Sequence, residues 1–210
     1  MTARLLPRTL PDDRPVALLL RHSERPPIPE GSMGMSLELT ERGVRAAREF
    51  GQALKGRVVF ARTSAVRRCV QTASALLEGS GTPLAPVEDP ALGVPSTFIK
   101  AGPETEKTLR ALGFERFMEH LVSGDAELPG LVHPAEGARL LREHALSSLT
   151  PAAGLHLFVT HDAMIAALVA RSWREPLDGG GWPAFLEGAA LWREGAAVML
   201  SYRDRCRAVD

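Results

Sequence analysis

Two uninterrupted apolar runs constrain the fold of this chain more than any other feature. Residues 15–20 (PVALLL) and 155–160 (LHLFVT) have the length of strands and lack the regular polar alternation of a half-exposed strand. Such runs are typical of strands that are covered on both faces. Because strand patterns alternate with helical ones along the chain, we predict an α/β fold. Its expected form is a three-layer sandwich, with a mostly parallel sheet and helices on both faces.

The remaining segments carry weaker signals. Thr40 opens a helical pattern, and the stretch 79–103 contains five prolines and is predicted as loop. We treat residues 1–210 as one domain in which residues 79–150 form a small inserted cap or specificity region. The other predicted elements are a strand at 57–61, helices from 64 through 77, around 114–121, over 136–149 and over 163–170, and a hairpin over 189–203.

Composition excludes several classes of protein. Lys plus Arg and Asp plus Glu each number 25, so the basic excess expected of a nucleic-acid-binding chain is missing. The longest strongly apolar run, residues 163–170, is far too short to cross a membrane. The N-terminal segment lacks the apolar core of a secretion signal, so we expect a cytoplasmic protein. Two cysteines, Cys69 and Cys206, do not make a disulfide framework.

Common catalytic motifs are missing from the sequence. It contains no G-x-x-x-x-G-K-[ST] phosphate loop, no G-x-G-x-x-G and no G-x-S-x-G elbow. It also lacks H-E-x-x-H zinc spacing, and we expect neither a metal nor a cofactor. A cysteine phosphatase needs an arginine six positions after its nucleophile, but Ala75 stands six positions after Cys69.

Polar residues follow both apolar runs directly. Arg21 and His22 come after the first run, and His161 and Asp162 come after the second. Ligands of open α/β sheets bind outside the carboxyl ends of the strands, so both histidines lie where a ligand is expected. Arg25 follows His22 by three residues and can crowd the same loop.

A third group belongs to the predicted helix after residue 63. Ser64, Arg68 and Thr72 recur every four residues and therefore share one helix face. Arginines that converge repel one another unless an anion lies between them, and their field should keep a histidine neutral near pH 7. The whole set fits phosphoryl transfer, in which an imidazole attacks phosphorus, arginines hold the oxygens and a carboxylic acid protonates the leaving oxygen.

The motifs resemble those of the histidine phosphatase superfamily, which includes phosphoglycerate mutase-like and acid-phosphatase-like enzymes. RHSERPP (21–27) resembles the family's R-H-G-x-R-x-P loop, and LTERG (39–43) resembles its L-T-x-x-G helix start. SAVRRCVQTA (64–73) is similar to S-P-L-x-R-A-x-Q-T-A, and VTHDAMI (159–165) resembles the second histidine motif. Residues 15–77 and 155–203 carry the resemblance, whereas residues 78–150 match no motif.

The resemblance implies a role for each matching residue. His22 would be the nucleophile that forms a phosphohistidine, and Asp162 would be the proton donor, as in the acid-phosphatase-like branch. The mutase-like branch takes its donor from a glutamate, and EDPALGVP (88–95) offers no convincing equivalent, although a glutamate of the insert stays open. The implied phosphate-binding residues are Arg21, Arg25, Arg68 and His161. The chain departs from the motifs at Ser23, where the family has glycine, and at Ala65, where it has proline.

The predicted function is a metal-independent phosphomonoester hydrolase that works through a phosphohistidine. The expected partner is a phosphorylated small molecule or a phosphoprotein substrate, with no nucleic acid and no membrane. Protein phosphohistidine phosphatase and phosphoglycerate mutase-like activity are the alternatives within this class. Two other classes are a metal oxygenase with His22, His161 and Asp162 as ligands, which three nearby arginines disfavour, and a phosphate-binding protein without turnover. Asp162 could also serve only as the N-cap of the helix that follows it.

Overall fold

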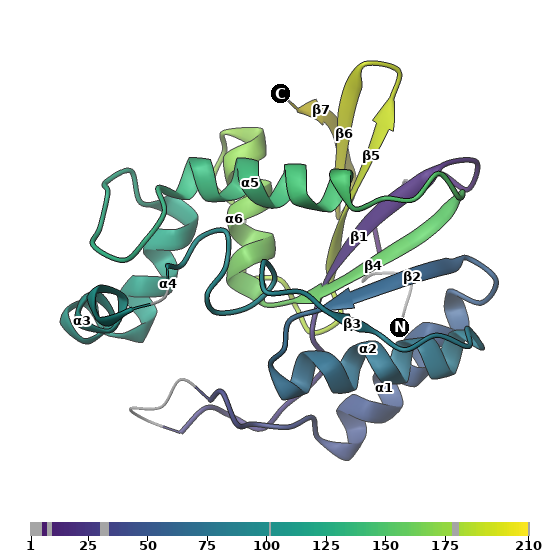
Figure 1. Ribbon diagram of the computed structural model, residues 1–210, viewed down its shortest axis with the longest axis horizontal. Coiled ribbons are helices and arrows are strands. Elements are labelled where there is room, and N and C mark those ends of the chain that lie inside the picture. The colour runs from purple at the N-terminus through teal and green to yellow at the C-terminus, as the bar shows by residue number, and fades with distance from the viewer. Residues whose placement is uncertain (1–5, 8–9, 30–33, 101, 178–180, 210) are drawn as a thin grey trace.

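The computed structural model describes residues 6–7, 10–29, 34–100, 102–177 and 181–209. Seven strands form one sheet in the order β3-β2-β4-β1-β5-β6-β7 (Figure 1). The strands are β1 (Pro15–Arg21), β2 (Val58–Thr63), β3 (Val87–Glu88), β4 (Gly154–Thr160), β5 (Gly188–Glu194), β6 (Ala197–Tyr202) and β7 (Arg205–Val209). The helices are α1 (Glu41–Ala53), α2 (Arg67–Ser80), α3 (Pro103–Leu112), α4 (Phe114–Ser123), α5 (Pro134–Ser147) and α6 (Asp162–Trp173).

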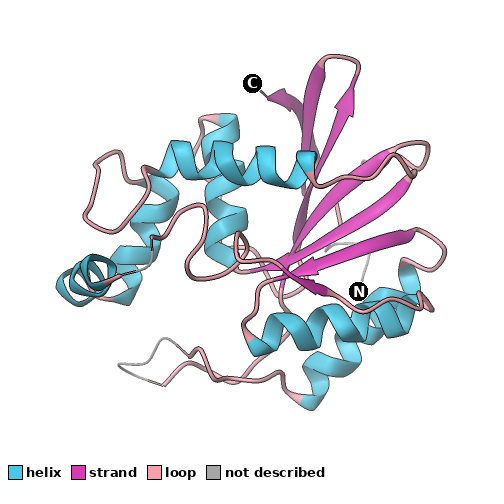
Figure 2. Ribbon diagram, in the orientation of Figure 1, coloured by secondary structure: helices cyan, strands magenta, loops and turns pink. Residues whose placement is uncertain are grey.

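Helices cover both faces of the sheet, which confirms the predicted three layers (Figure 2). Strand β1 shows why its sequence is apolar without interruption. Val16, Leu18 and Leu20 pack in the cluster that contains α1 and α2, whereas Ala17 and Leu19 pack in the cluster that contains α5 and α6. Successive side chains of a strand point to opposite faces, so a strand buried between two helical layers needs apolar residues at every position.

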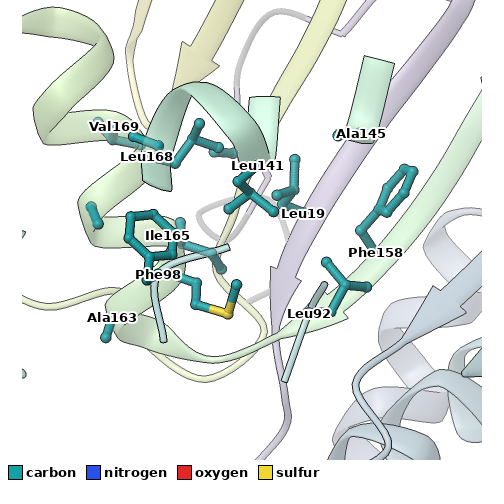
Figure 3. Close-up of a cluster of buried hydrophobic side chains, with 14 of the residues drawn as sticks. Leu19, Leu92, Phe98, Leu141, Ala145, Phe158, Ala163, Ile165, Leu168 and Val169 are labelled. Carbon is teal, nitrogen blue, oxygen red and sulfur yellow. The ribbon is translucent and has the colours of Figure 1, made fainter. Parts of the chain in front are cut away.

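The cluster on the α5–α6 side of the sheet is the larger of the two cores. Leu19 and Phe158 of the sheet face Leu141 of α5 and Ile165 of α6 (Figure 3). All four side chains are completely buried. Helix α5 is therefore part of the helical layer that covers the sheet. Of the segment 79–150, it is α3 and α4 that stand away from the sheet (Figure 1).

Three parallel strands end at the same edge of the sheet. Strand β4 lies between β1 and β2 and pairs in parallel with both, so that Arg21 is opposite Thr160 and Thr63 is opposite Val159. The residues that follow these strands, among them His22, Ser64 and His161, are brought together by this register. The residues at which the sequence predicts a ligand therefore lie together at one edge of the sheet.

The structure also differs from the sequence-based expectation. The sheet is mixed, because β1 to β4 are parallel but β5, β6 and β7 are antiparallel. The hairpin is extended by β7, whose RCRAV sequence looks polar because an edge strand needs little apolar surface. Helix α3 buries only Thr108 of its ten residues, so it has almost no apolar face by which a sequence pattern could reveal it.

Candidate active site

His22 lies directly after β1 and is almost completely buried, with 2% of its surface exposed. Its Nδ1 is 2.7 Å from the carbonyl oxygen of Ser23, and its Nε2 accepts a hydrogen bond of 3.0 Å from Nε of Arg68. A carbonyl oxygen can only accept and a guanidinium N–H can only donate. The ring is therefore neutral, with its proton on Nδ1 and the lone pair of Nε2 directed to Arg68. The pKa of His22 is lowered to about 2, mainly by burial and also by His161, Arg68 and Arg21, while the hydrogen bond to Ser23 raises it.

Arg68 joins the two histidines. Its Nη1 donates a hydrogen bond of 2.7 Å to the carbonyl oxygen of Gly34, and its Nη2 lies 3.4 Å from Nδ1 of His161. The other ring nitrogen of His161, Nε2, is 3.3 Å from Oγ of Ser64. Burial, followed by the charges of Arg68, Arg21 and Arg25, lowers the pKa of His161 to about 3. Both imidazoles are therefore neutral at pH 7.

Arg21 is held by contacts from two distant parts of the chain. Its Nη1 donates a hydrogen bond of 2.6 Å to the carbonyl oxygen of Pro183, and its Nη2 forms an ion pair of 2.9 Å with Asp162. The guanidinium stacks on the ring of Phe185, 4.2 Å from its centroid. Burial lowers the pKa of Arg21, and the charge of Arg25 lowers it further, while Asp162 raises it. The pKa of Arg25 is lowered in the same way by burial.

Asp162 is the first residue of α6, and the N-cap position belongs to His161. The interpretation of Asp162 as the N-cap is therefore wrong by one position, although Oδ1 of its carboxylate accepts a hydrogen bond of 2.9 Å from the amide of Ala163. Within the described part of the chain, Asp162 is the only carboxylate among the residues that line the pocket beside His22. No glutamate of the described insert residues lines that pocket.

The loop that carries His22 is supported by α2 and α1. Oγ1 of Thr72 accepts a hydrogen bond of 2.9 Å from the amide of Ser23 and donates one of 2.7 Å to the carbonyl oxygen of Arg68. The hydroxyl of Ser23, which replaces the motif glycine, donates a bond of 2.7 Å to the carbonyl of Gly43 in α1. A Cβ at Gly43 would lie 2.2 Å from the carbonyl oxygen of Glu24, which explains the glycine of the LTERG motif.

Adjacent arginines of α2 point in different directions. Arg68 is buried with 6% of its surface exposed, whereas the side chain of Arg67 is 70% exposed and pairs with Glu38 at 2.9 Å. Consecutive residues of a helix are about 100° apart, so only one of them can reach the pocket. Of these two arginines, Arg68 is the one that lines the pocket.

A pocket of about 170 Å³ opens beside these groups. Its polar lining consists of His22, Arg25, Arg68, His161 and Asp162. Much of the remaining wall comes from α4, within the segment that resembles no motif. Two neighbouring residues, Phe185 and Pro183, had no signal in the sequence, because their contacts with Arg21 span more than 160 positions of the chain.

Among the described residues there is no group of three or more His, Cys, Asp or Glu side chains that could hold a metal ion. The same residues contain no helix with the length and apolar character needed to cross a membrane.

The fold and the pocket together define a class of protein: a three-layer α/β domain with two neutral histidines and three arginines at the carboxyl edge of its parallel strands. Residues 17–93 match the family model described as the histidine phosphatase superfamily, branch 1. This match covers 77 of the 210 residues and agrees with the sequence motifs that resemble the same superfamily. A search of curated protein sequences finds no match.

Solved structures share the whole fold. A mycobacterial glucosyl-3-phosphoglycerate phosphatase in complex with VO3 is 20% identical, with a TM-score of 0.60 over 90% of this chain and 99% of its own. YhfR of Bacillus stearothermophilus is 18% identical, with a TM-score of 0.56 over 91% and 98% of the two chains. A phosphoserine phosphatase variant of Entamoeba histolytica in complex with phosphoserine is 17% identical, with a TM-score of 0.55 over 89% and 94%. At these identities the likeness establishes the fold.

Proposed function

We propose that the protein is a metal-independent phosphomonoester hydrolase that forms a phosphohistidine on Nε2 of His22. The observation that carries the proposal is the state of this nitrogen. It is unprotonated, it belongs to a side chain that lines the pocket, and its hydrogen-bond partner Arg68 is a cation suited to bind phosphate. A neutral imidazole whose proton is held on Nδ1 is ready to attack through Nε2.

In the first step, the lone pair of Nε2 attacks the phosphorus atom of the substrate. The N–P bond forms while the ester P–O bond breaks, and the electron pair of that bond leaves with the alcohol oxygen. Arg68 exchanges its bond to Nε2 for the phosphoryl oxygens, which Arg21, Arg25 and His161 also contact. The ring becomes positively charged, and the carbonyl of Ser23 at Nδ1 stabilises that charge.

The leaving oxygen takes its proton from Asp162. In the structure Asp162 pairs with Arg21 as a carboxylate, whereas a donor must be in the acid form. A bound phosphate dianion competes with Asp162 for the positive charge of Arg21. A second negative charge beside the phosphate is unfavourable, and Asp162 is therefore neutral in the complex. Asp162 then accepts a proton from the water that attacks phosphorus. The P–N bond breaks, phosphate leaves and the lone pair returns to Nε2.

Rapid quenching with ³²P-labelled monoester tests the proposal. The wild type should give acid-labile label on His22 and turnover that persists in excess chelator. His22→Ala should lose both while keeping its melting temperature, and His161→Ala should turn over slowly with the label still on His22. Label on His161 would reverse the assignment of the two histidines. Activity that a chelator abolishes and a divalent cation restores would overturn the metal-independent mechanism.

A further inference from the structure

The pocket has a polar end and an apolar end. The polar end, which we call the phosphate end, consists of the five polar side chains named above. Four residues that line the apolar end, Phe114, Phe117, Met118 and Leu121, come from one face of α4. The loops after β1 and before β5 add Met35 and Trp182. Apart from the five polar residues at the phosphate end, no lining residue of the described chain carries a charge.

Exposed apolar side chains also gather at this pocket. Six large hydrophobic residues are exposed within the described ranges, and four of them line it: Met35, Val94, Phe114 and Trp182. These four come from separate segments of the chain, each with about two fifths of its surface open (39–43%). Solvent-exposed apolar residues that converge from different segments mark a binding surface, whereas scattered ones need no explanation.

The cationic side chains at the phosphate end are already engaged in contacts, so they provide few free donors for a second anion. Arg68 contacts His22, His161 and Gly34, and Arg21 pairs with Asp162. A carboxylate or ammonium on the alcohol part of the substrate would lie against the wall of α4 without a counter-charge, which is unfavourable. Among the described residues that line the pocket, Arg25 is the other arginine besides Arg68, and its Nε is buried without a hydrogen-bond partner.

We propose that the substrate is a phosphate monoester whose alcohol part is an uncharged alkyl or aryl group, held against α4, Met35 and Trp182. This inference rests on the proposed function and names the substrate class of the same site. In this arrangement Arg25 binds the phosphate group of the substrate, in keeping with its position in the RHSERPP loop beside His22. Met35, Met118 and Met164 are flexible side chains that adapt to different apolar shapes, so a range of chain lengths is accepted.

A homologous series of n-alkyl phosphates, from methyl to octyl, measures this directly. Their leaving groups have nearly equal intrinsic reactivity, so kcat/KM reports how the chain is bound. Each added methylene should raise kcat/KM about two- to fourfold until the pocket is full. Phosphoserine, phosphoethanolamine and 3-phosphoglycerate, which carry a second charge, should be turned over more slowly than butyl phosphate, which is of similar size.

Two rim variants and one matched control complete the test. Phe114→Ser and Trp182→Ser should lower the ratio of kcat/KM for octyl over methyl phosphate at least about tenfold, since each removes several methylene contacts. Leu84→Ser replaces another exposed apolar residue, one that lies away from the pocket, and should leave the ratio unchanged. Melting temperatures show whether each variant is folded.

The outcomes are distinct. A flat alkyl series, a preference for phosphoserine or 3-phosphoglycerate, or faster turnover of a histidine-phosphorylated protein overturns the inference and leaves the phosphohistidine mechanism standing. If no monoester of either kind is hydrolysed and His22 takes up no label, the proposed function itself fails. An equal effect of Leu84→Ser and Phe114→Ser on the octyl-to-methyl ratio also contradicts the role of α4.

Discussion

Substitutions of Arg68 and of its neighbour Arg67 distinguish most clearly between the proposed site and the rest of helix α2. Arg68 is buried, and its three nitrogens contact Nε2 of His22, Nδ1 of His161 and the carbonyl of Gly34. A donor aimed at charge that develops in the transition state is worth roughly 3–4 kcal/mol. Arg68→Ala should therefore lower kcat/KM about 10² to 10³-fold.

Arg68→Lys separates charge from geometry. Lysine keeps the positive charge, but a single ammonium cannot reproduce the planar fork that spans the two histidines. We expect it to recover only part of the activity lost in Arg68→Ala. Because burial is the largest cause of the low pKa of His22, removal of Arg68 should raise that pKa but leave it below its ordinary value.

Arg67→Ala is the matched control, one residue away on the same helix. The pair between Arg67 and Glu38 is at the surface, where such pairs contribute about 0–1 kcal/mol to stability. Activity should be unchanged. The assay is steady-state kcat/KM on p-nitrophenyl phosphate and butyl phosphate for all three variants, with thermal melts beside it. If Arg67→Ala is as damaging as Arg68→Ala, the assignment of the phosphate-binding arginine is wrong.

Two further predictions concern proton transfer and pH. Asp162→Asn should lower activity on alkyl phosphates about 10² to 10⁴-fold but on p-nitrophenyl phosphate far less, because nitrophenolate leaves without a proton. An equal loss of activity on both substrates would indicate that the substitution displaces helix α6. His22 and His161 have folded pKa values of about 2 and about 3, so below about pH 6.5 the unfolded chain binds protons that the folded chain does not. The free energy of unfolding should therefore decrease as the pH is lowered, by up to roughly 1.4 kcal/mol per pH unit for each histidine. Urea titrations between pH 7.5 and 5 should show a shallower fall for His22→Gln, and an identical slope would refute the buried, neutral state of His22.

Local chemistry in the sequence was enough to determine the layers and the polar residues of the candidate site. The apolar runs of β1 and β4 require cover on both faces, and the four-residue spacing of Arg68 and Thr72 defines one side of α2. Ser64, which was predicted on the same helix face, precedes the helix. These signals are readable because strand and helix periodicities act over a few residues. Residues without such a periodicity, in α3 and β7, were not predicted as elements.

Only the tertiary structure decided how these pieces meet. The placement of β4 between β1 and β2 brings His161 to His22, and no local pattern encodes that order. The same holds for Phe185 and Pro183 at Arg21, and for the carbonyl of Gly34 at Arg68. The apolar wall of α4 was visible as a helical stripe, but its use in the pocket depends on where the helix packs. Contacts between distant segments follow from the packing of the whole chain. A single sequence therefore reveals the polar groups of a site more readily than the shape and the lining of its pocket.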